Sequence, residues 1–457
     1  MGEILQQLHQ MVWGPWTLAI FLGVGIYYSI KGGWFQIRGL PFWWKHTVGN
    51  LIGENGKPDG RDGENGISQL QSVCTALAAT VGTGNIAGVA TALTAGGPGA
   101  LLWMWLCAGI GMATAYGETV LGLKSRRRDR KGQYISGPFL YMEELLGARW
   151  MGKLYGILCV LCSLGMGSMV QSNSAVSTVV YSLNMPALAA GGILTVLVML
   201  VIMGGIGRIG RVAEKLVPAA SGIYILFSLA VILSCWREIP GAVRSMISCG
   251  LTPQAAAGGT AGYGLSRAIR YGMARGVFSN EAGLGTLAVL HGAARDTAPE
   301  QQGMWAMFEV FFDTVIMCTL TGLVILCTTD SLNAGPEMTG SALAAWCFGT
   351  KLGEGGELLI SGSMAVFAFA TMIAWFYLGR QAAAYVWGGH VLTGWLYPIL
   401  FLAAVFVGSQ WKLETVWVLS DLWNGLMAFP NLTALIFLRK QVVYPQWRKN
   451  KRLTGRR

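Results

Sequence analysis

Two short polar interruptions lie at the centres of apolar segments that are long enough to cross a membrane. The first is Thr80-Val81-Gly82-Thr83-Gly84-Asn85, in the middle of residues 71–97, and the second runs from Phe278 to Gly285. In lipid, backbone groups freed by such an interruption cost several kcal/mol each unless protein or a water-lined cavity satisfies them. The two stretches therefore predict a binding site inside the membrane.

The first interruption offers two kinds of backbone group. Unwinding at Gly82 and Gly84 frees N–H groups at the start of the following half-helix, near Asn85, where the helix dipole favours a carboxylate. Glycine is expected there because ligand and backbone approach closely. Freed carbonyl oxygens suit a small hard cation, and those expected to do so belong to Ala78, Ala79 and Val81.

The second interruption offers side chains. Ser279 and Asn280 can form hydrogen bonds, and Glu281 can supply a charge. The alternative for both stretches is a pair of glycine-rich helix-packing faces, since small residues let membrane helices approach closely. Asn, Ser and Glu are not needed for close approach, so a binding site is favoured.

The composition is that of a membrane protein. Of 457 residues, 53% are hydrophobic and 12% are charged, against about 25% charged in average soluble domains. Continuous apolar blocks of about 20 residues indicate an all-α polytopic protein and exclude a membrane β-barrel. The net charge of +11 lies in short loops and the tail, as the positive-inside rule describes, and does not indicate nucleic-acid binding.

Eleven spanning helices are expected, and two of them carry the interruptions. Their residue ranges are 12–30, 68–93, 98–123, 150–182, 186–206, 212–235, 262–293, 303–328, 358–380, 386–408 and 413–438. Without the first helix, ten remain in two groups of five, residues 68–235 and 262–438, with a long loop at 236–261 between them. Each group begins with an interrupted helix. Because each group contains an odd number of helices, the second group crosses the membrane in the opposite direction to the first, which predicts an inverted repeat within one transporter domain.

The loop charges predict the orientation in the cell membrane. Residues 124–131 form the most basic loop, which places this loop, the loop at 207–211 and the basic tail at 439–457 in the cytoplasm. The connection at 329–357 is acidic and falls outside, as does the N-terminus. The arginines before the second interruption then fall on its outer half, where we expect them to line a vestibule: Arg267, Arg270 and Arg275.

Long stretches of the chain resemble one family. TALAATVGTGNIAGVATALTAGGPGALLWMW and RGVFSNEAGLGT look like the two signature stretches of the alanine or glycine:cation symporter family, and residues 311–326, 365–379 and 420–435 are also similar to it. The resemblance implies the leucine-transporter-type fold of the amino acid–polyamine–organocation superfamily. It also implies sodium-coupled uptake of a small neutral amino acid such as alanine or glycine.

The resemblance assigns roles to the matching positions. The substrate pocket would comprise Thr80, Gly82, Thr83, Gly84, Asn85, Phe278, Ser279, Asn280 and Trp375. The cation would contact carbonyls of Ala78, Ala79 and Val81 together with the hydroxyl of Thr371. The family pattern pairs two hydroxyls there, whereas this chain has Ala370 before Thr371. One oxygen is missing, which leaves a proton as the alternative coupling ion.

Ionisable groups inside the membrane are candidates for coupling because their burial is costly and implies a partner. The candidates are Glu118, Glu281 and Asp313. Glu309 and Asp313 are four residues apart on one helical face, where like charges need a proton, an ion or a partner. For His291 we favour a structural contact over a proton relay. Asp421 and Asn424 are expected to satisfy polar groups within the last helix.

Other classes of function find little support. Gly205 to Gly210 matches GxGxxG but follows a membrane segment rather than a strand, so we expect a tight cytoplasmic turn. No metal-ligand spacing and no nucleophile–base grouping indicates an enzyme, and no organic cofactor is expected. A channel or an amino acid sensor is a further alternative, disfavoured because no repeated pore loop or signalling domain appears.

Overall fold

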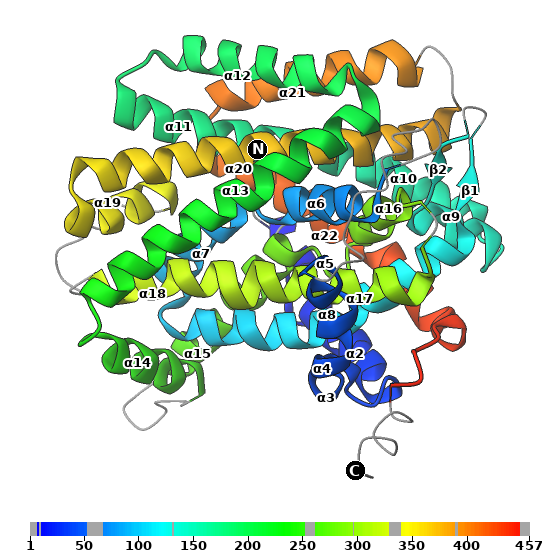
Figure 1. Ribbon diagram of the computed structural model, residues 1–457, viewed down its shortest axis with the longest axis horizontal. Coiled ribbons are helices and arrows are strands. Elements are labelled where there is room, and N and C mark those ends of the chain that lie inside the picture. The colour runs from blue at the N-terminus through cyan, green and yellow to red at the C-terminus, as the bar shows by residue number, and fades with distance from the viewer. Residues whose placement is uncertain are drawn as a thin grey trace.

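The computed structural model describes residues 7–8, 11–52, 67–129, 132–251, 261–295, 297–328, 340–388 and 392–447. Its helices form one bundle (Figure 1). Described segments that are long and apolar enough to span a membrane number six, or seven if one bent pair counts as a single span. Residues 329–339, the first part of the connection expected to be acidic, and the tail beyond residue 447 lie outside the described residues.

The chain enters the bundle through α2 (Pro15–Lys31), which is followed by the short helices α3 (Phe35–Arg38), α4 (Leu40–His46) and α5 (Val48–Ile52). Proline at the start of α2 fits the first helical turn, where its missing N–H has no partner to lose. The helix packs closely on α8 (Gly99–Ser125), since a Cβ added at Gly25 would lie 2.2 Å from Ile110.

The first group of five begins with the interrupted helix. Ser68 and Gln71 form a capping box that starts α6, and the axis bends by 52° before the chain continues. Its elements are α6 (Gln69–Thr80), η2 (Thr83–Asn85), α7 (Ala87–Gly96), α8, α10 (Arg149–Leu164), η3 (Gly165–Val170), α11 (Gln171–Leu183), α12 (Ala187–Ile202) and α13 (Gly205–Ser234). Between α8 and α10 lie a small antiparallel pair, β1 (Arg127–Arg128) and β2 (Tyr134–Ile135), and α9 (Pro138–Glu144).

The second group also begins with an interrupted helix. Its elements are α15 (Ala261–Asn280), α16 (Thr286–Gly292), α17 (Pro299–Val310), η4 (Phe311–Cys318), α18 (Thr319–Thr328), α20 (Glu354–Trp387), η5 (Leu392–Leu396), α21 (Tyr397–Gln410) and α22 (Leu413–Phe437), which η6 (Arg439–Gln441) follows. In Figure 1 the short helices α6 and α16 lie near the centre of the bundle, with α20 on one side and α17 and α8 on the other.

Each of the eleven expected segments overlaps one helix or a run of two or three consecutive helices, but three connections differ from expectation. Residues 207–211, expected as a loop and a tight turn, lie in the first turns of α13, which begins at Gly205 with φ +63° at that glycine. The loop at 236–261 contains α14 (Ile239–Leu251), and the connection at 329–357 contains α19 (Gly340–Leu352). The described part of each helix covers 13 residues, which does not match the membrane-length apolar pattern that predicts the eleven segments.

Candidate functional site

The first interruption redirects two backbone donors away from the helix. The N–H of Gly82 donates to Asn85 Oδ1 over 2.8 Å, and the N–H of Thr83 donates to Gln171 Oε1 over 3.3 Å. In a continuous helix these N–H groups would bond to the carbonyls four residues earlier, those of Ala78 and Ala79. The interruption thus frees two carbonyl oxygens in the centre of the bundle.

One of the freed carbonyls faces the hydroxyl expected beside it. Thr371 Oγ1, on α20, donates to the carbonyl of Ala78 over 2.9 Å. Ala370 is buried and has no side-chain oxygen. Val81 is buried where the backbone leaves the helical region, with ψ 87°. The oxygen atoms gathered here come from backbone carbonyls and a hydroxyl, and hard cations prefer oxygen ligands of this kind.

The glycines of the first interruption allow neighbouring elements to approach closely. A Cβ added at Gly82 would lie 2.6 Å from Thr371 Oγ1 and 3.3 Å from Gln171 Oε1. At Gly84 it would lie 3.3 Å from the Cα of Ser279. The two interruptions therefore contact each other directly, and α20 closes on the first of them.

The second interruption is held by an unusual backbone. Glu281 has φ +56°, a left-handed conformation that is rare for residues other than glycine, and Gly283 and Gly285 also have positive φ. Asn280 stabilises the turn, since its Oδ1 accepts the N–H of Ala282 over 3.1 Å and its Nδ2 donates to Thr314 Oγ1 over 3.1 Å.

A buried carboxylate joins the two interruptions. Asn85 Nδ2 donates to Asp313 Oδ1 over 2.6 Å, and Ser279 Oγ donates to Asp313 Oδ2 over 2.8 Å. Thr314 Oγ1 donates to the same Oδ2 over 2.8 Å. All four side chains are buried. The structure thus brings Asn85, Ser279 and Asp313 together.

Two aromatic side chains flank this region. Trp375 Nε1 donates to Glu281 Oε1 over 2.9 Å, and the Trp375 side chain lies so close to Gly167 that a Cβ added there would be 2.4 Å from the Trp375 Cβ and 2.6 Å from its Cγ. Phe278 packs on Trp417 with ring centroids 4.9 Å apart. Trp375 therefore lies beside the second interruption, of which Phe278 is the first residue.

Glu118 is linked to the second interruption through one side chain of α22. Asn431 Nδ2 donates to Glu118 Oε1 over 2.5 Å and to the carbonyl of Gly283 over 2.9 Å. The hydroxyl of Tyr141 donates to Asn431 Oδ1. Asn431 thus bridges the Glu118 side chain and the backbone of the turn. Among the described residues, no hydrogen bond joins Glu118 to the Asp313 cluster.

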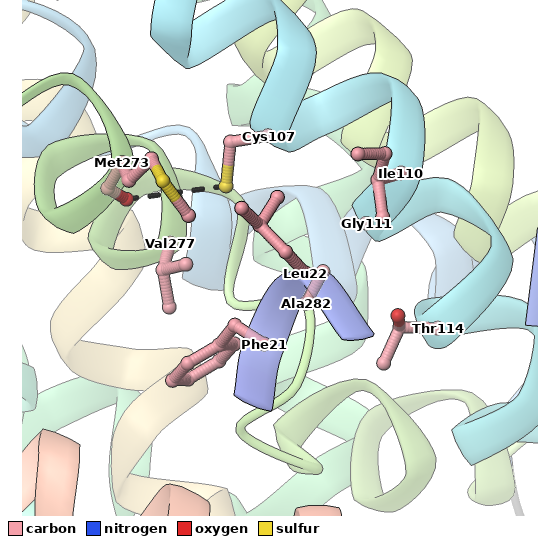
Figure 2. A pocket seen from close by; sticks show the side chains of 9 residues that line it. All are labelled: Phe21, Leu22, Cys107, Ile110, Gly111, Thr114, Met273, Val277 and Ala282. Atoms are coloured by element: carbon pink, nitrogen blue, oxygen red, sulfur yellow. Dashed lines mark hydrogen bonds between the residues drawn. The ribbon is translucent and has the colours of Figure 1, made fainter. Parts of the chain in front are cut away.

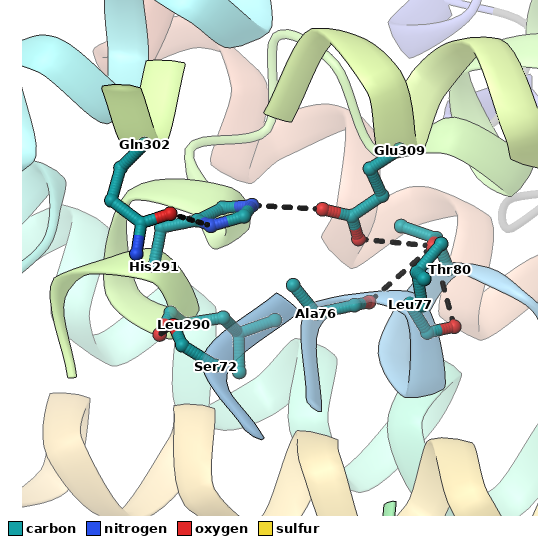
Figure 3. A network of polar contacts seen from close by, with 8 residues as sticks. All are labelled: Ser72, Ala76, Leu77, Thr80, Leu290, His291, Gln302 and Glu309. Carbon is teal, nitrogen blue, oxygen red and sulfur yellow. Dashed lines mark hydrogen bonds and ion pairs between the residues drawn. The ribbon is translucent and has the colours of Figure 1, made fainter. Parts of the chain in front are cut away.

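A second polar network ties α6 to α16 and α17 (Figure 3). His291 Nε2 lies 2.9 Å from Glu309 Oε2, and His291 Nδ1 lies 3.2 Å from Gln302 Oε1. Thr80 Oγ1 donates to Glu309 Oε1 over 3.1 Å. Glu309 and Asp313, although four residues apart, thus bind different partners. Thr80 belongs to this network rather than to the Asp313 cluster.

The expected vestibule arginine is buried instead. Arg275 is 7% exposed and forms an ion pair with Asp421 on α22. Its guanidinium carbon lies 4.7 Å from the ring centroid of Trp417. Asp421 therefore pairs with an arginine of another helix, α15, which the expectation for this residue did not include. Loop-charge counting could not reveal this pairing, which depends on the tertiary contact between α15 and α22.

Several polar groups near the interruptions were missed by sequence reasoning. Gln171, Thr314 and Asn431 make the contacts described above, and their signal was a polar residue inside an apolar span. Buried polar atoms without a hydrogen-bond partner among the described residues also occur around the interruptions: Thr83 Oγ1, Glu281 Oε2, Ser420 Oγ, and Oδ1 and Nδ2 of Asn424.

A small pocket beside the second interruption is a different feature (Figure 2). It lies between α2, α8 and α15, with Phe21, Thr114 and Ala282 among its lining residues. The lining is mostly apolar, and it contains none of the expected substrate or cation residues. The pocket is therefore distinct from the stretches that the sequence predicts to bind the substrate.

Two interrupted helices in contact, each opening a group of five, define a membrane transporter of the leucine-transporter type. Solved structures agree: that of MhsT in complex with L-phenylalanine aligns with a TM-score of 0.51, at 15% identity, over 83% of this chain and 100% of that one. The sodium:alanine symporter family matches residues 1–452, and the chain belongs to that family.

Curated relatives are similar over nearly their whole length. The sodium/alanine symporter AgcS of Methanococcus maripaludis is 36% identical over 448 residues, which cover 96% of this chain and 95% of the relative. The probable sodium/glutamine symporter GlnT of Bacillus subtilis is 32% identical over 446 residues, which cover 97% of this chain and 90% of the relative. The family and the fold expected from the sequence are thus confirmed.

Proposed function

We propose that the protein imports a small neutral amino acid of the alanine or glycine type together with Na⁺, by alternating access. The observation that carries the proposal is the pair of carbonyls freed at Ala78 and Ala79, with the Thr371 hydroxyl on the first of them. Hydroxyl and backbone oxygens suit Na⁺, and the names of the relatives AgcS and GlnT support it.

The substrate would lie between the interruptions. Its carboxylate would bind the N–H groups that follow Gly82, at the positive end of the half-helix. Its ammonium would bind carbonyls and side chains around Asn280 and Glu281, and its side chain would face Phe278 and Trp375. Cation and substrate then stabilise the same closed arrangement of the first interruption, which is the coupling that symport requires.

The transport cycle would use the two repeats, residues 68–235 and 262–438, as the symmetry-related parts that expose the site to one side at a time. The N-terminus would lie outside and the C-terminus in the cytoplasm of the cell membrane. Glu118, Glu281 and Asp313 remain proposed coupling groups, and of these Asp313 has the strongest support because it contacts both interruptions.

Proton coupling is the second candidate. It is favoured by Ala370, which removes one oxygen from the cation position, and by the buried His291–Glu309 pair, which touches the first interruption through Thr80. A non-transporting sensor or a channel has no specific observation in its favour.

The test is alanine uptake by purified protein in proteoliposomes. An inward Na⁺ gradient without a proton gradient should drive accumulation, and a proton gradient without Na⁺ should not. Accumulation that needs only the proton gradient would reject Na⁺ as the coupling ion. Saturable binding without accumulation under either gradient would indicate a sensor.

A further inference from the structure

The last helix, α22, presents one face to the second interruption. Trp417 packs on Phe278, and further along the helix Asn431 donates to the carbonyl of Gly283. Asn424 lies seven positions after Trp417 and seven before Asn431. Seven residues are close to two turns at 3.6 residues per turn, so Asn424 lies on the same face, opposite the stretch between Phe278 and Gly283.

Asn424 is wholly buried, and neither atom of its amide has a hydrogen-bond partner among the described residues. The same holds for the hydroxyl of Ser420, one turn earlier. Buried polar side chains in native proteins are nearly always hydrogen-bonded, and an unpaired amide in the middle of a membrane helix is costly. Their unpaired state points to a ligand that supplies the missing partners.

The neighbours of Ser420 place it beside the proposed substrate site. A Cβ added at Gly165, the first residue of η3, would lie 3.4 Å from the Cα of Ser420. Two residues later in η3, Gly167 packs on Trp375, and Gln171, directly after η3, accepts the N–H of Thr83. One short π-helical segment thus links α22 with both walls of the site.

We propose that Ser420 and Asn424 form a subsite for the side chain of the transported amino acid, and that this subsite takes a neutral side chain with a hydroxyl or a carboxamide. A primary amide offers a donor and an acceptor together, and a hydroxyl or a second carboxamide returns both. A methyl group returns neither. Two charged groups on α22 and α15, Asp421 and Arg275, pair with each other, so neither of them is assigned to the substrate side chain.

The inference rests on the proposed function, because it takes the ligand to be an amino acid. It sharpens that function, because it ranks substrates such as serine and glutamine above apolar ones of equal size. A site built to hydrogen-bond a polar group discriminates strongly against the analogue that lacks it, whereas a difference of one methylene in an apolar pocket discriminates weakly.

The test is competition against radiolabelled alanine uptake by the wild-type protein in proteoliposomes, with inward Na⁺ and proton gradients both imposed. Serine is compared with 2-aminobutyrate, which replaces the hydroxyl by a methyl group, and glutamine with norleucine. We expect serine, glutamine or both to compete at least about tenfold better than the apolar counterpart. The two arms distinguish a hydroxyl from a carboxamide. Equal competition within both pairs would overturn the inference while leaving the proposed function intact.

Variants of α22 test whether the preference for polar over apolar competitors depends on Asn424. Asn424→Leu should reduce the ratio between polar and apolar competitors to about one, from at least about ten. Thr433→Val is the matched control, because the Thr433 hydroxyl donates to the carbonyl of Phe429 within the same helix, and this variant should keep the wild-type ratio. If Asn424→Leu does not reach the membrane, the wild-type comparison still decides. Absence of amino acid uptake and binding under both gradients would overturn the proposed function and the inference together.

Discussion

Thr371 on α20 and Ala78 on α6 are joined by a hydrogen bond of 2.9 Å from hydroxyl to carbonyl. The carbonyl is available because the N–H of Gly82 turns to Asn85 instead of closing the helix. A continuous helix and an interrupted one thus meet at two oxygen atoms. A cation that bound both would fix the distance between α20 and the first interruption, which is how an ion can control a conformational change.

Loss of the Thr371 hydroxyl should weaken cation binding. Thr371→Ala should raise the Na⁺ concentration for half-maximal alanine uptake by about tenfold or more, since one charge-assisted ligand is worth about 1.5–3 kcal/mol. Thr371→Ser retains the hydroxyl and is the control. An unchanged Na⁺ requirement in Thr371→Ala would place the ion elsewhere.

The close contact at Gly82 predicts that a methyl group is not tolerated there. A Cβ would lie 2.6 Å from Thr371 Oγ1 and 3.3 Å from Gln171 Oε1, so Gly82→Ala should abolish uptake by displacing α20 or the Thr83 N–H contact. Gly88→Ala in α7 is the matched control, because nothing lies within 4 Å of its added Cβ. It should retain uptake and gain up to about 1 kcal/mol of stability. Normal uptake by Gly82→Ala would contradict the packing.

The buried ion pair between Arg275 and Asp421 predicts a large loss of stability when it is broken. Asp421→Asn leaves the guanidinium without its counter-charge and should lower the free energy of unfolding by about 3–5 kcal/mol, measured by thermal unfolding in detergent. The double variant Arg275→Met with Asp421→Leu should recover most of it.

An exposed pair serves as the control for this measurement. Arg149 and Glu143 lie 3.5 Å apart, and the Arg149 side chain is 72% exposed. Arg149→Ala should therefore change stability by less than about 1 kcal/mol. If Asp421→Asn were as stable as Arg149→Ala, the charge of Arg275 would not depend on Asp421.

A variant of Glu309 distinguishes Na⁺ coupling from proton coupling. Glu309→Gln keeps groups that can bond to Thr80 and His291 but cannot release a proton, so uptake driven by a Na⁺ gradient should persist within about threefold if Na⁺ is the coupling ion. Uptake is measured under a Na⁺ gradient alone and under a proton gradient alone. His46→Gln is the control, because His46 is half-buried on α4 and its Nδ1 lies 2.7 Å from the carbonyl of Phe42 in the same helix. Complete loss of uptake in Glu309→Gln alone would favour the proton scheme.

Much of this arrangement could be predicted from the sequence. Glycines and polar residues inside apolar segments marked both interruptions, because their cost in lipid is a local property. The Arg275–Asp421 pair and the unpaired Asn424 could not be predicted, because both depend on how α22 lies against α15. The partners of Glu309 and Asp313 could not be predicted for the same reason. Their spacing suggested mutual repulsion, whereas tertiary contacts give each carboxyl group its own hydrogen-bond donors.

The extra helix α2 makes the two halves of the bundle unequal. A Cβ added at Gly283 would lie 2.5 Å from the ring of Phe21, and Tyr28 donates to the carbonyl of Leu435 on α22. The second interruption is therefore covered laterally by a segment that belongs to neither repeat. We expect α2 to act as an insulating layer, because a change that shortens or displaces it would uncover a turn in which Glu281, Gly283 and Gly285 have positive φ.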